Sequence, residues 1–324
     1  MSINSRQLLT LLITAAITAC SGGGGGGPTP TTADFSGRVV DAPLANSLVF
    51  YDANRNLQHD PSEPSVRSDA QGLVNLDSIS QQCTATGCDA AFVSLGGTDV
   101  LTGIEQNDSV LVFNLTSFST RPSFINISPL STIIALTGEE DRVLNAINGD
   151  IDAENALYSD PWQQALNGNA NAQKIARANA QMGTLMAVTK SLFPANTSQE
   201  VLNKLSREYA SAIDKGLSPL SNEAALAELI ENTAAGLSRG GVSSSITQTV
   251  AQALHPILAA IADENIDIDG AASQAIIRSA QEYLLTETEQ LRSGTTSEAQ
   301  YLAALDLVEL HKDNADLFES LPDT

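Results

Sequence analysis

Residues 52–63 read Asp52-Ala-Asn54-Arg-Asn56-Leu-Gln58-His-Asp60-Pro-Ser-Glu63, between the apolar stretches 47–51 and 71–76. Oxygen-bearing side chains occupy positions one, three, five, seven, nine and twelve of this loop: Asp52, Asn54, Asn56, Gln58, Asp60 and Glu63. This is the ligand spacing of an EF-hand calcium loop, in which the closing Glu supplies two oxygens. The flanking residues, however, favour strands over the helices of an EF-hand. The stretch therefore predicts a Ca²⁺ site in a loop between two β-strands.

Three residues of this loop depart from the calcium pattern. Position six, where the pattern requires Gly for a sharp turn with positive φ, is Leu57. Arg55 and His59 add positive or potentially positive charge inside the loop. The alternative is an Asx-rich turn that binds no metal, because Asn and Asp favour such turns. If the loop does bind Ca²⁺, we expect a weak site of the extracellular class, with a dissociation constant of about 10⁻⁴ to 10⁻³ M.

The N-terminal residues 1–19 are predicted to be a signal peptide. Arg6 precedes an apolar run, residues 8–19, that is too short to span a bilayer as a mature helix. The end of the run, Ile17-Thr-Ala-Cys20, resembles the lipobox of bacterial lipoproteins. That resemblance implies cleavage before Cys20 and attachment of lipid to Cys20. The alternative is an ordinary signal peptide that ends at Ala19.

Residues 20–33 are predicted to be a tether. Six consecutive glycines, residues 22–27, precede a Pro- and Thr-rich segment that has nothing to bury. The residue after Cys20 is Ser21 rather than Asp, which in lipoproteins of Gram-negative bacteria implies sorting to the outer membrane. We therefore expect a protein anchored by lipid at the outer membrane or the cell surface.

The acidic charge of the chain limits its partners. It has 38 acidic and 16 basic residues and a formal charge of −22. Removing residues 1–19 takes away Arg6 and no acidic residue, which leaves −23. Such a surface repels nucleic acid and anionic headgroups, so we expect the folded part to bind neither of them. A protein partner in the envelope or at the surface is compatible with this charge.

The composition changes along the chain and predicts an α+β protein. Six of the eight Phe residues lie between Phe35 and Phe124, whereas all five Lys residues lie at or after Lys174. We predict an antiparallel β-sandwich over residues 34–127, with strands at 37–41, 47–51, 71–76, 91–95 and 109–113. An all-α bundle of six to eight helices is predicted over 128–324, starting at Ser128 and Pro129. Its further helices are expected at 173–192, 199–215, 224–237, 244–262, 271–291 and 298–317, with capping boxes at Thr197 with Glu200 and at Ser297 with Gln300.

Two cysteines, Cys83 and Cys88, are separated by four residues. Outside the cytoplasm, and with Cys20 occupied by lipid, they form an even pair and favour a small disulfide. A metal-thiolate site is the alternative, but it needs further His or Cys ligands nearby.

The first part of the chain also carries short motifs of a known kind of module. They are Gly37-x-Val-x-Asp41, the Asp52 to Glu63 loop, Ser68-Asp-Ala-x-Gly72, Gly96-Gly-Thr-Asp99 and Ile127-Ser-Pro-Leu-Ser-Thr-Ile133. Over about residues 36–136 the chain resembles the prealbumin-like β-sandwich modules of bacterial surface proteins, the carboxypeptidase-regulatory-like and calcium-binding B-like repeats of adhesins. The resemblance implies a Ca²⁺-binding scaffold or spacer without catalytic activity.

No motif in the sequence indicates catalysis. Gly-x-Ser-x-Gly, a phosphate-binding Gly loop, His-Glu-x-x-His and Cys-x-x-Cys are all missing. We therefore expect a protein that is not an enzyme and that acts in adhesion, assembly or structural support. One rival is an envelope binding protein whose helical part carries a hydrophobic ligand or a secreted substrate. A weaker rival is a hydrolase, which would need a Ser or Asp hydrogen-bonded to His255 or His311.

Overall fold

The computed structural model describes residues 35–303 except 42, 82, 84–89, 101–102, 104, 108, 116–121, 148–150, 152, 238–240 and 264–282. The chain divides into two units, Met1–Ala33 and Asp34–Thr324, and all the described residues belong to the second. The predicted signal peptide, the tether, Cys20, Cys88 and His311 lie outside the described residues.

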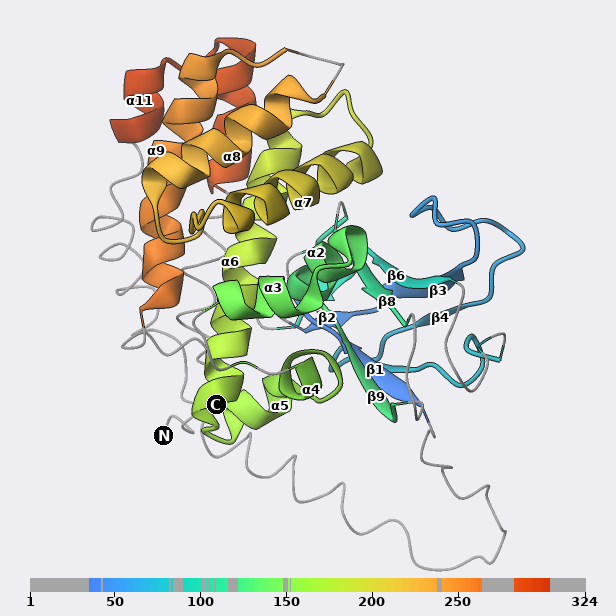
Figure 1. The fold of residues 1–324 in the computed structure, drawn as a ribbon. Helices are drawn as coiled ribbons and strands as arrows, with labels where there is room; N and C mark the ends of the chain where they lie inside the picture. Colours follow the sequence, from blue (N-terminus) through green and yellow to red (C-terminus); the bar gives the residue numbers. More distant parts are fainter. Residues whose placement is uncertain are drawn as a thin grey trace, which may run out of the picture. The chain divides into compact units, whose positions relative to one another are not determined.

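The second unit is a mixed α+β fold, in which the described strands precede the described helices (Figure 1). All five predicted strands overlap an observed one. The strands are β1 Ser36–Val39, β2 Leu44–Ala45, β3 Leu48–Asp52, β4 Ser65–Arg67, β5 Leu73–Asn75, β6 Ala91–Leu95, β7 Thr98–Asp99, β8 Val110–Asn114 and β9 Phe124–Ile127.

The strands form two main sheets and a two-stranded β2-β7 pair. The first sheet, β4-β3-β6-β8, is antiparallel, and its centre pairs Phe50 with Val93 and Val93 with Val112. The second has the order β5-β1-β9. Its β1-β9 pairing is parallel, with Gly37 opposite Ile125, so the expectation of purely antiparallel strands is wrong at this pair. Parallel neighbours need a long crossover connection, and here most of the β region lies between the two strands.

The helices are α2 Pro129–Thr137, α3 Glu140–Ala146, α4 Ala153–Leu157, α5 Pro161–Leu166, α6 Ala170–Leu192, α7 Ser198–Asp214, α8 Glu223–Ala235, α9 Ser244–Ala262 and α11 Glu298–Ala303. Residues 283–293 are also helical. In Figure 1, α2 lies next to β8, and the long helix α6 runs past α2 towards α8 and α9. No helix of the described part combines the length and the apolar character needed to cross a bilayer.

The predicted helix starts are confirmed by their caps. Ser128 accepts a hydrogen bond from the Ser131 backbone N–H and is followed by Pro129 at the first helical position. Thr197 and Glu200 form a capping box at the start of α7, and Ser297 and Gln300 exchange the same two hydrogen bonds before α11. The start of each of these helices is therefore set by residues three positions apart in the sequence.

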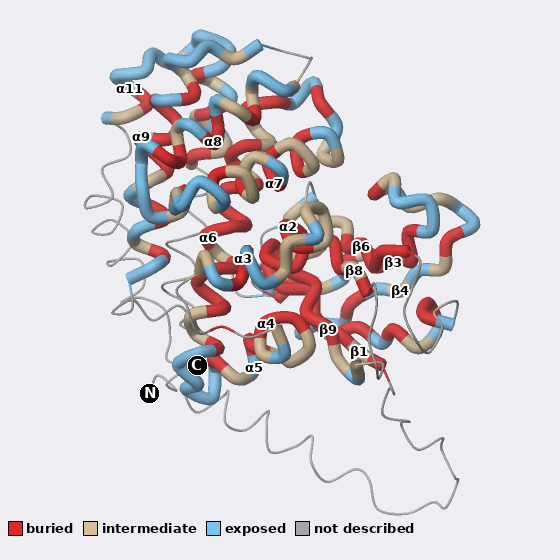
Figure 2. The backbone as a smooth tube through the Cα atoms, viewed as in Figure 1, coloured by how far each residue is buried: buried red, intermediate tan, exposed pale blue. Residues whose placement is uncertain are grey.

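Strands and helices share one hydrophobic core. A single cluster of buried side chains includes Val39 and Phe92 from the strands, Ile133 from α2 and Leu185 from α6. Figure 2 shows buried backbone running from β6 and β8 through α2 into α6. Because strands and helices contribute to the same core, the boundary between two domains at residue 127 stays a prediction.

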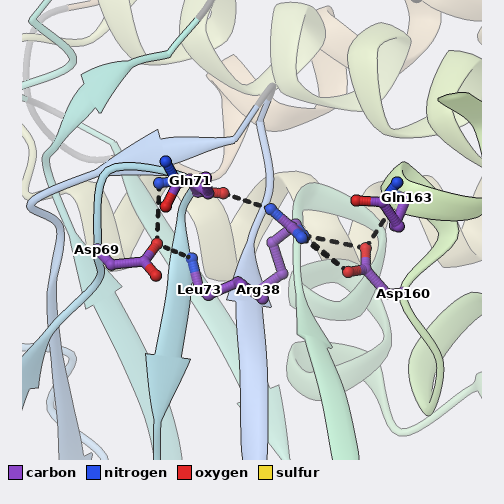
Figure 3. Close-up of polar contacts among 6 residues, drawn as sticks. All are labelled: Arg38, Asp69, Gln71, Leu73, Asp160 and Gln163. Carbon is purple, nitrogen blue, oxygen red and sulfur yellow. Dashed lines mark hydrogen bonds and ion pairs between the residues drawn. The ribbon is translucent and has the colours of Figure 1, made fainter. Parts of the chain in front are cut away.

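An ion pair joins the second sheet to α5 (Figure 3). Arg38 of β1, which is 5% exposed, donates from Nε to both carboxylate oxygens of Asp160 at 3.0 Å and from Nη2 to Oδ2 at 2.8 Å. Its Nη1 donates to the backbone carbonyl of Gln71. Asp160 is also the N-cap of α5, since its carboxylate accepts from the Gln163 N–H. One carboxylate thus caps a helix and neutralises a buried arginine.

Candidate functional site

The loop predicted to bind Ca²⁺ connects β3 to its neighbour β4 in the first sheet. Asp52 is the last residue of β3, and β4 begins two residues after Glu63. Asp52 is fully buried and Glu63 is 7% exposed. Asp52 accepts from the N–H groups of Asn56 at 3.1 Å and Leu57 at 2.8 Å. Glu63 accepts from those of Ala53 at 2.9 Å and Asp60 at 3.0 Å. The two end carboxylates therefore fasten the loop to itself.

The middle of the loop is held by the remaining predicted ligands. Asp60 Oδ2 accepts from the side-chain amides of Asn54 at 2.7 Å and Asn56 at 3.2 Å. Asn54 Oδ1 accepts from the Asn56 N–H, and Asn56 Oδ1 accepts from the Gln58 N–H. Five of the six residues are thus brought together by direct hydrogen bonds, while Gln58 is exposed and contributes its backbone.

The electrostatics of the loop centre on Asp52. Burial raises the pKa of its carboxyl group, hydrogen bonds from the Leu57 and Asn56 N–H groups partly oppose the rise, and the charge of Glu63 adds to it. Among the described residues, no three His, Cys, Asp or Glu side chains are gathered as a group that could hold a metal ion. Binding Ca²⁺ would require the loop to exchange some of its internal hydrogen bonds for coordination.

Position six of the loop adopts the positive φ of the calcium pattern although it is not Gly. Leu57 has a φ of 57° and Arg55 a φ of 58°. The Leu57 side chain is buried in a small cluster with Phe50, Val93 and Val112. The departure identified in the sequence therefore does not prevent the turn from forming.

Two further contacts position the loop. His59 packs its ring edge-on against Phe50, with centroids 5.2 Å apart, and its Nε2 lies 3.2 Å from the backbone oxygen of Glu63. The backbone oxygen of Arg55 accepts from Nε2 of Gln199 at 3.2 Å, which connects the loop to the first turn of α7.

The other predicted site residues are placed as follows. Cys83 packs against the main core, and because Cys88 lies outside the described residues, the disulfide stays a prediction. His255 Nε2 is 3.4 Å from the backbone carbonyl oxygen of Ser221, which is not a nucleophile. Among the residues that the structure describes, no Ser or Asp side chain is hydrogen-bonded to His255 in the way that a hydrolase would need.

A cavity of about 490 Å³ lies between the strands and the helices. Its walls come from Asp41, from residues 105–107 and 109–111, from α6 and the start of α7, and from Leu285, Thr286 and Glu289. Sequence reasoning missed it, because its walls are far apart in the chain. The one signal in the sequence was Gly183 inside a helical pattern, since Gly at such a position often serves close packing. The lining mixes charged, polar and apolar side chains.

Comparison of the chain with protein-family models, with curated proteins and with solved structures found no match.

Proposed function

We propose that this chain is a lipid-anchored protein of the cell envelope or surface, acting in adhesion, assembly or structural support without catalysis, and that its Asp52–Glu63 loop binds Ca²⁺ weakly. The anchor is Cys20, at the end of the signal-like segment. We also propose that the two sheets form a prealbumin-like sandwich. Supporting this, Phe35, beside β1, packs edge-on against Phe92 of β6 with ring centroids 5.8 Å apart.

The observation that carries the Ca²⁺ proposal is the pair of buried carboxylates at the two ends of one loop. Glu63 is close enough to Asp52 for its charge to raise the pKa of the Asp52 carboxyl group. Neither carboxylate is in an ion pair with a side chain of the described residues. Buried charges are costly unless a counter-charge or hydrogen bonds compensate them. A divalent cation supplies that charge, and it would bind the carboxylate oxygens in exchange for some of the loop's internal hydrogen bonds.

Thermal unfolding of the full-length protein in chelator and in Ca²⁺ tests the proposal. At about 10 mM Ca²⁺, a site with a dissociation constant of about 10⁻⁴ to 10⁻³ M stabilises the folded state by about 1.4–2.7 kcal/mol. For a folded unit of this size the midpoint should rise by roughly 2–8 °C.

Two variants separate the loop from general effects of Ca²⁺. Glu63→Gln keeps an oxygen that accepts an N–H but removes the charge, so it should abolish the rise. Asp69→Asn is the matched control, because Asp69 also accepts two backbone N–H groups in a turn, from Gln71 and Leu73. It should keep the rise. A midpoint that does not respond in the wild type, or a rise that survives Glu63→Gln, would refute the Ca²⁺ site.

Ligand carriage by the helical part is a separate hypothesis. The structural feature that bears on this hypothesis is the cavity beside α6. The hypothesis does not depend on Ca²⁺ binding by the Asp52–Glu63 loop.

A further inference from the structure

A smaller cavity, of about 100 Å³, lies where β8, the end of α2, the start of α3 and the end of α4 meet (Figure 1). Its lining includes Phe113 and Asn114 of β8, Gly138 after α2, Glu140 of α3 and Tyr158 after α4. A Cβ added at Gly138 would meet no atom within 4 Å, so open space adjoins this side of the cavity. The 490 Å³ cavity shares no lining residue with it.

The acidic side chain of this lining lacks a counter-ion. Glu140 is partly buried, and no basic side chain of the described residues forms an ion pair with it. Burial raises the pKa of its carboxyl group, and the charge of Asp141 adds to the rise. Burial also raises the pKa of Tyr158, and the charge of Glu140 adds to that rise. A positive group beside the carboxylate and the phenol would relieve both effects.

Two further features give the cavity a negative potential. It reaches the last turn of α2 at Ala135 and its C-cap at Gly138. A helix C-terminus carries partial negative charge, and no basic residue in the last turn of α2 balances it. Asn114 donates from Nδ2 to the Ala135 carbonyl at 2.8 Å, while its buried Oδ1 accepts no hydrogen bond among the described residues. The lining contains no Lys, Arg or His, so it favours a positively charged donor over an anion.

The aromatic side chains and the size of the cavity narrow the kind of cation. The rings of Phe113 and Tyr158 meet edge to face, with centroids 5.9 Å apart and an interplanar angle of 78°. Aromatic rings attract ammonium groups and pack against methylene groups. The volume is below the range of about 300–1,000 Å³ that is usual for sites of whole small ligands, so it suits the end of one side chain. A compact ammonium group on a flexible stem fits such a space better than a planar guanidinium group.

We propose that this cavity receives the ammonium end of a lysine side chain from a partner protein, with Glu140 as its counter-ion and the rings of Phe113 and Tyr158 beside its methylene groups. A basic partner complements a chain with a formal charge of −22. The inference names the chemistry of the partner in the proposed assembly role. It rests on that role for the choice of a protein as the source of the lysine, and it does not rest on Ca²⁺ binding.

Saturation-transfer NMR of the full-length protein with a blocked lysine, Nα-acetyl-lysine methylamide, tests the cavity at neutral pH. The blocked lysine should bind, and its ε-methylene group should receive the most saturation. The same compound acetylated at Nε lacks the charge and should bind about tenfold more weakly. No binding of the blocked lysine at millimolar concentration, or equal binding of the two compounds, overturns the proposal.

Propylamine separates a lysine side chain from a free amine. Binding of propylamine without binding of the blocked lysine would make the cavity a site for a small free amine and would overturn the proposal. These measurements use the wild-type protein in chelator, so their outcome is independent of the Ca²⁺ response that tests the proposed function.

Glu140→Gln assigns the counter-ion. It should weaken binding of the blocked lysine about tenfold and remove the difference between the charged and the Nε-acetylated compounds. Asp141→Asn is the matched control, because Asp141 is the next residue of α3, is exposed and does not line the cavity, yet its replacement removes the same net charge. It should bind both compounds like the wild type. Equal weakening by the two changes would show that only the overall charge of the chain attracts the lysine, which contradicts the assignment.

Discussion

Replacing Asp160 with Ser removes the charge that neutralises Arg38 and leaves the helix cap in place. The Arg38 side chain is 6% exposed and that of Asp160 is 21% exposed. Ser is as good an N-cap as Asp, so α5 should keep its first turn. What is lost is a contact from two guanidinium nitrogens to both carboxylate oxygens. Arg38 then keeps the Gln71 carbonyl as an acceptor.

The cost follows from the burial of the two groups. Breaking a fully buried ion pair from one side destabilises a protein by about 3–5 kcal/mol, because the remaining charge is left without its partner. Asp160 is partly exposed, so water can enter the space that the carboxylate leaves. We therefore expect Asp160→Ser to lower the free energy of unfolding by about 2–3 kcal/mol, and the midpoint of thermal unfolding by roughly 4–9 °C.

Urea unfolding followed by circular dichroism measures this effect in a double-mutant cycle. The second single variant is Arg38→Met, which keeps most of the apolar stem of the side chain. The double variant Arg38→Met/Asp160→Ser buries no charge and keeps the cap, so it should recover to within about 1 kcal/mol of the wild type. An Asp160→Ser variant within about 0.5 kcal/mol of the wild type, which is the usual error of additivity, would refute the reasoning. So would a double variant whose loss equals the sum of the two single losses.

Two further predictions concern Gly183 and Asp52. Although Ala is the better helix former, Gly183→Ala should destabilise the protein by about 1–3 kcal/mol, because its methyl group would overlap the Asp41 carboxylate. In the control Gly236→Ala, the methyl group would meet the movable end of a lysine side chain, so its stability should stay within about 0.5 kcal/mol of the wild type in the same urea assay. Equal effects of the two changes would contradict this explanation. Burial raises the pKa of Asp52 above 3.8, so in chelator the contribution of Asp52 to stability should be fully present below pH 3.8 and lost as the pH rises through the raised pKa. Asp52→Asn should therefore flatten the dependence of stability on pH, measured by urea unfolding between about pH 3.5 and 7. A slope that the substitution leaves unchanged would show that other groups cause it.

Local signals in the sequence predicted the regular elements well. The predicted helix 244–262 coincides with α9, and predicted strand 91–95 coincides with β6. The Thr197 and Glu200 capping box marked the start of α7 to within one residue. Such features depend on residues three or four positions apart, which the sequence shows directly.

Long-range contacts were not predictable in the same way. Strand β9 was missed, because its partner β1 lies most of the β region away and no hairpin joins them. The short helices α4 and α5 have too few residues to show a period. The Arg38–Asp160 pair joins residues 122 positions apart. The same limit hid the cavity, whose lining residues come from segments as far apart in the sequence as Asp41 and Glu289.

The loop of Asp52 shows how tertiary packing can override a local preference. A left-handed conformation costs a residue with a Cβ roughly 1–2 kcal/mol, and this cost is why the sequence argued against Leu57 at position six. Burying a leucine side chain gains about 1.5–3 kcal/mol, and Leu57 is 7% exposed beneath the loop. Its N–H also donates to Asp52.

The gain from burial is thus similar in size to the cost of the turn and can outweigh it. Gly at position six would relieve the strain but would give up the contact with Phe50 and Val112. The loop therefore keeps its shape through a hydrophobic anchor, where the calcium pattern relies on Gly. A loop held in this way is shaped before any cation arrives, so the Ca²⁺ experiment tests whether its two buried carboxylates need a counter-charge, separately from whether the loop folds.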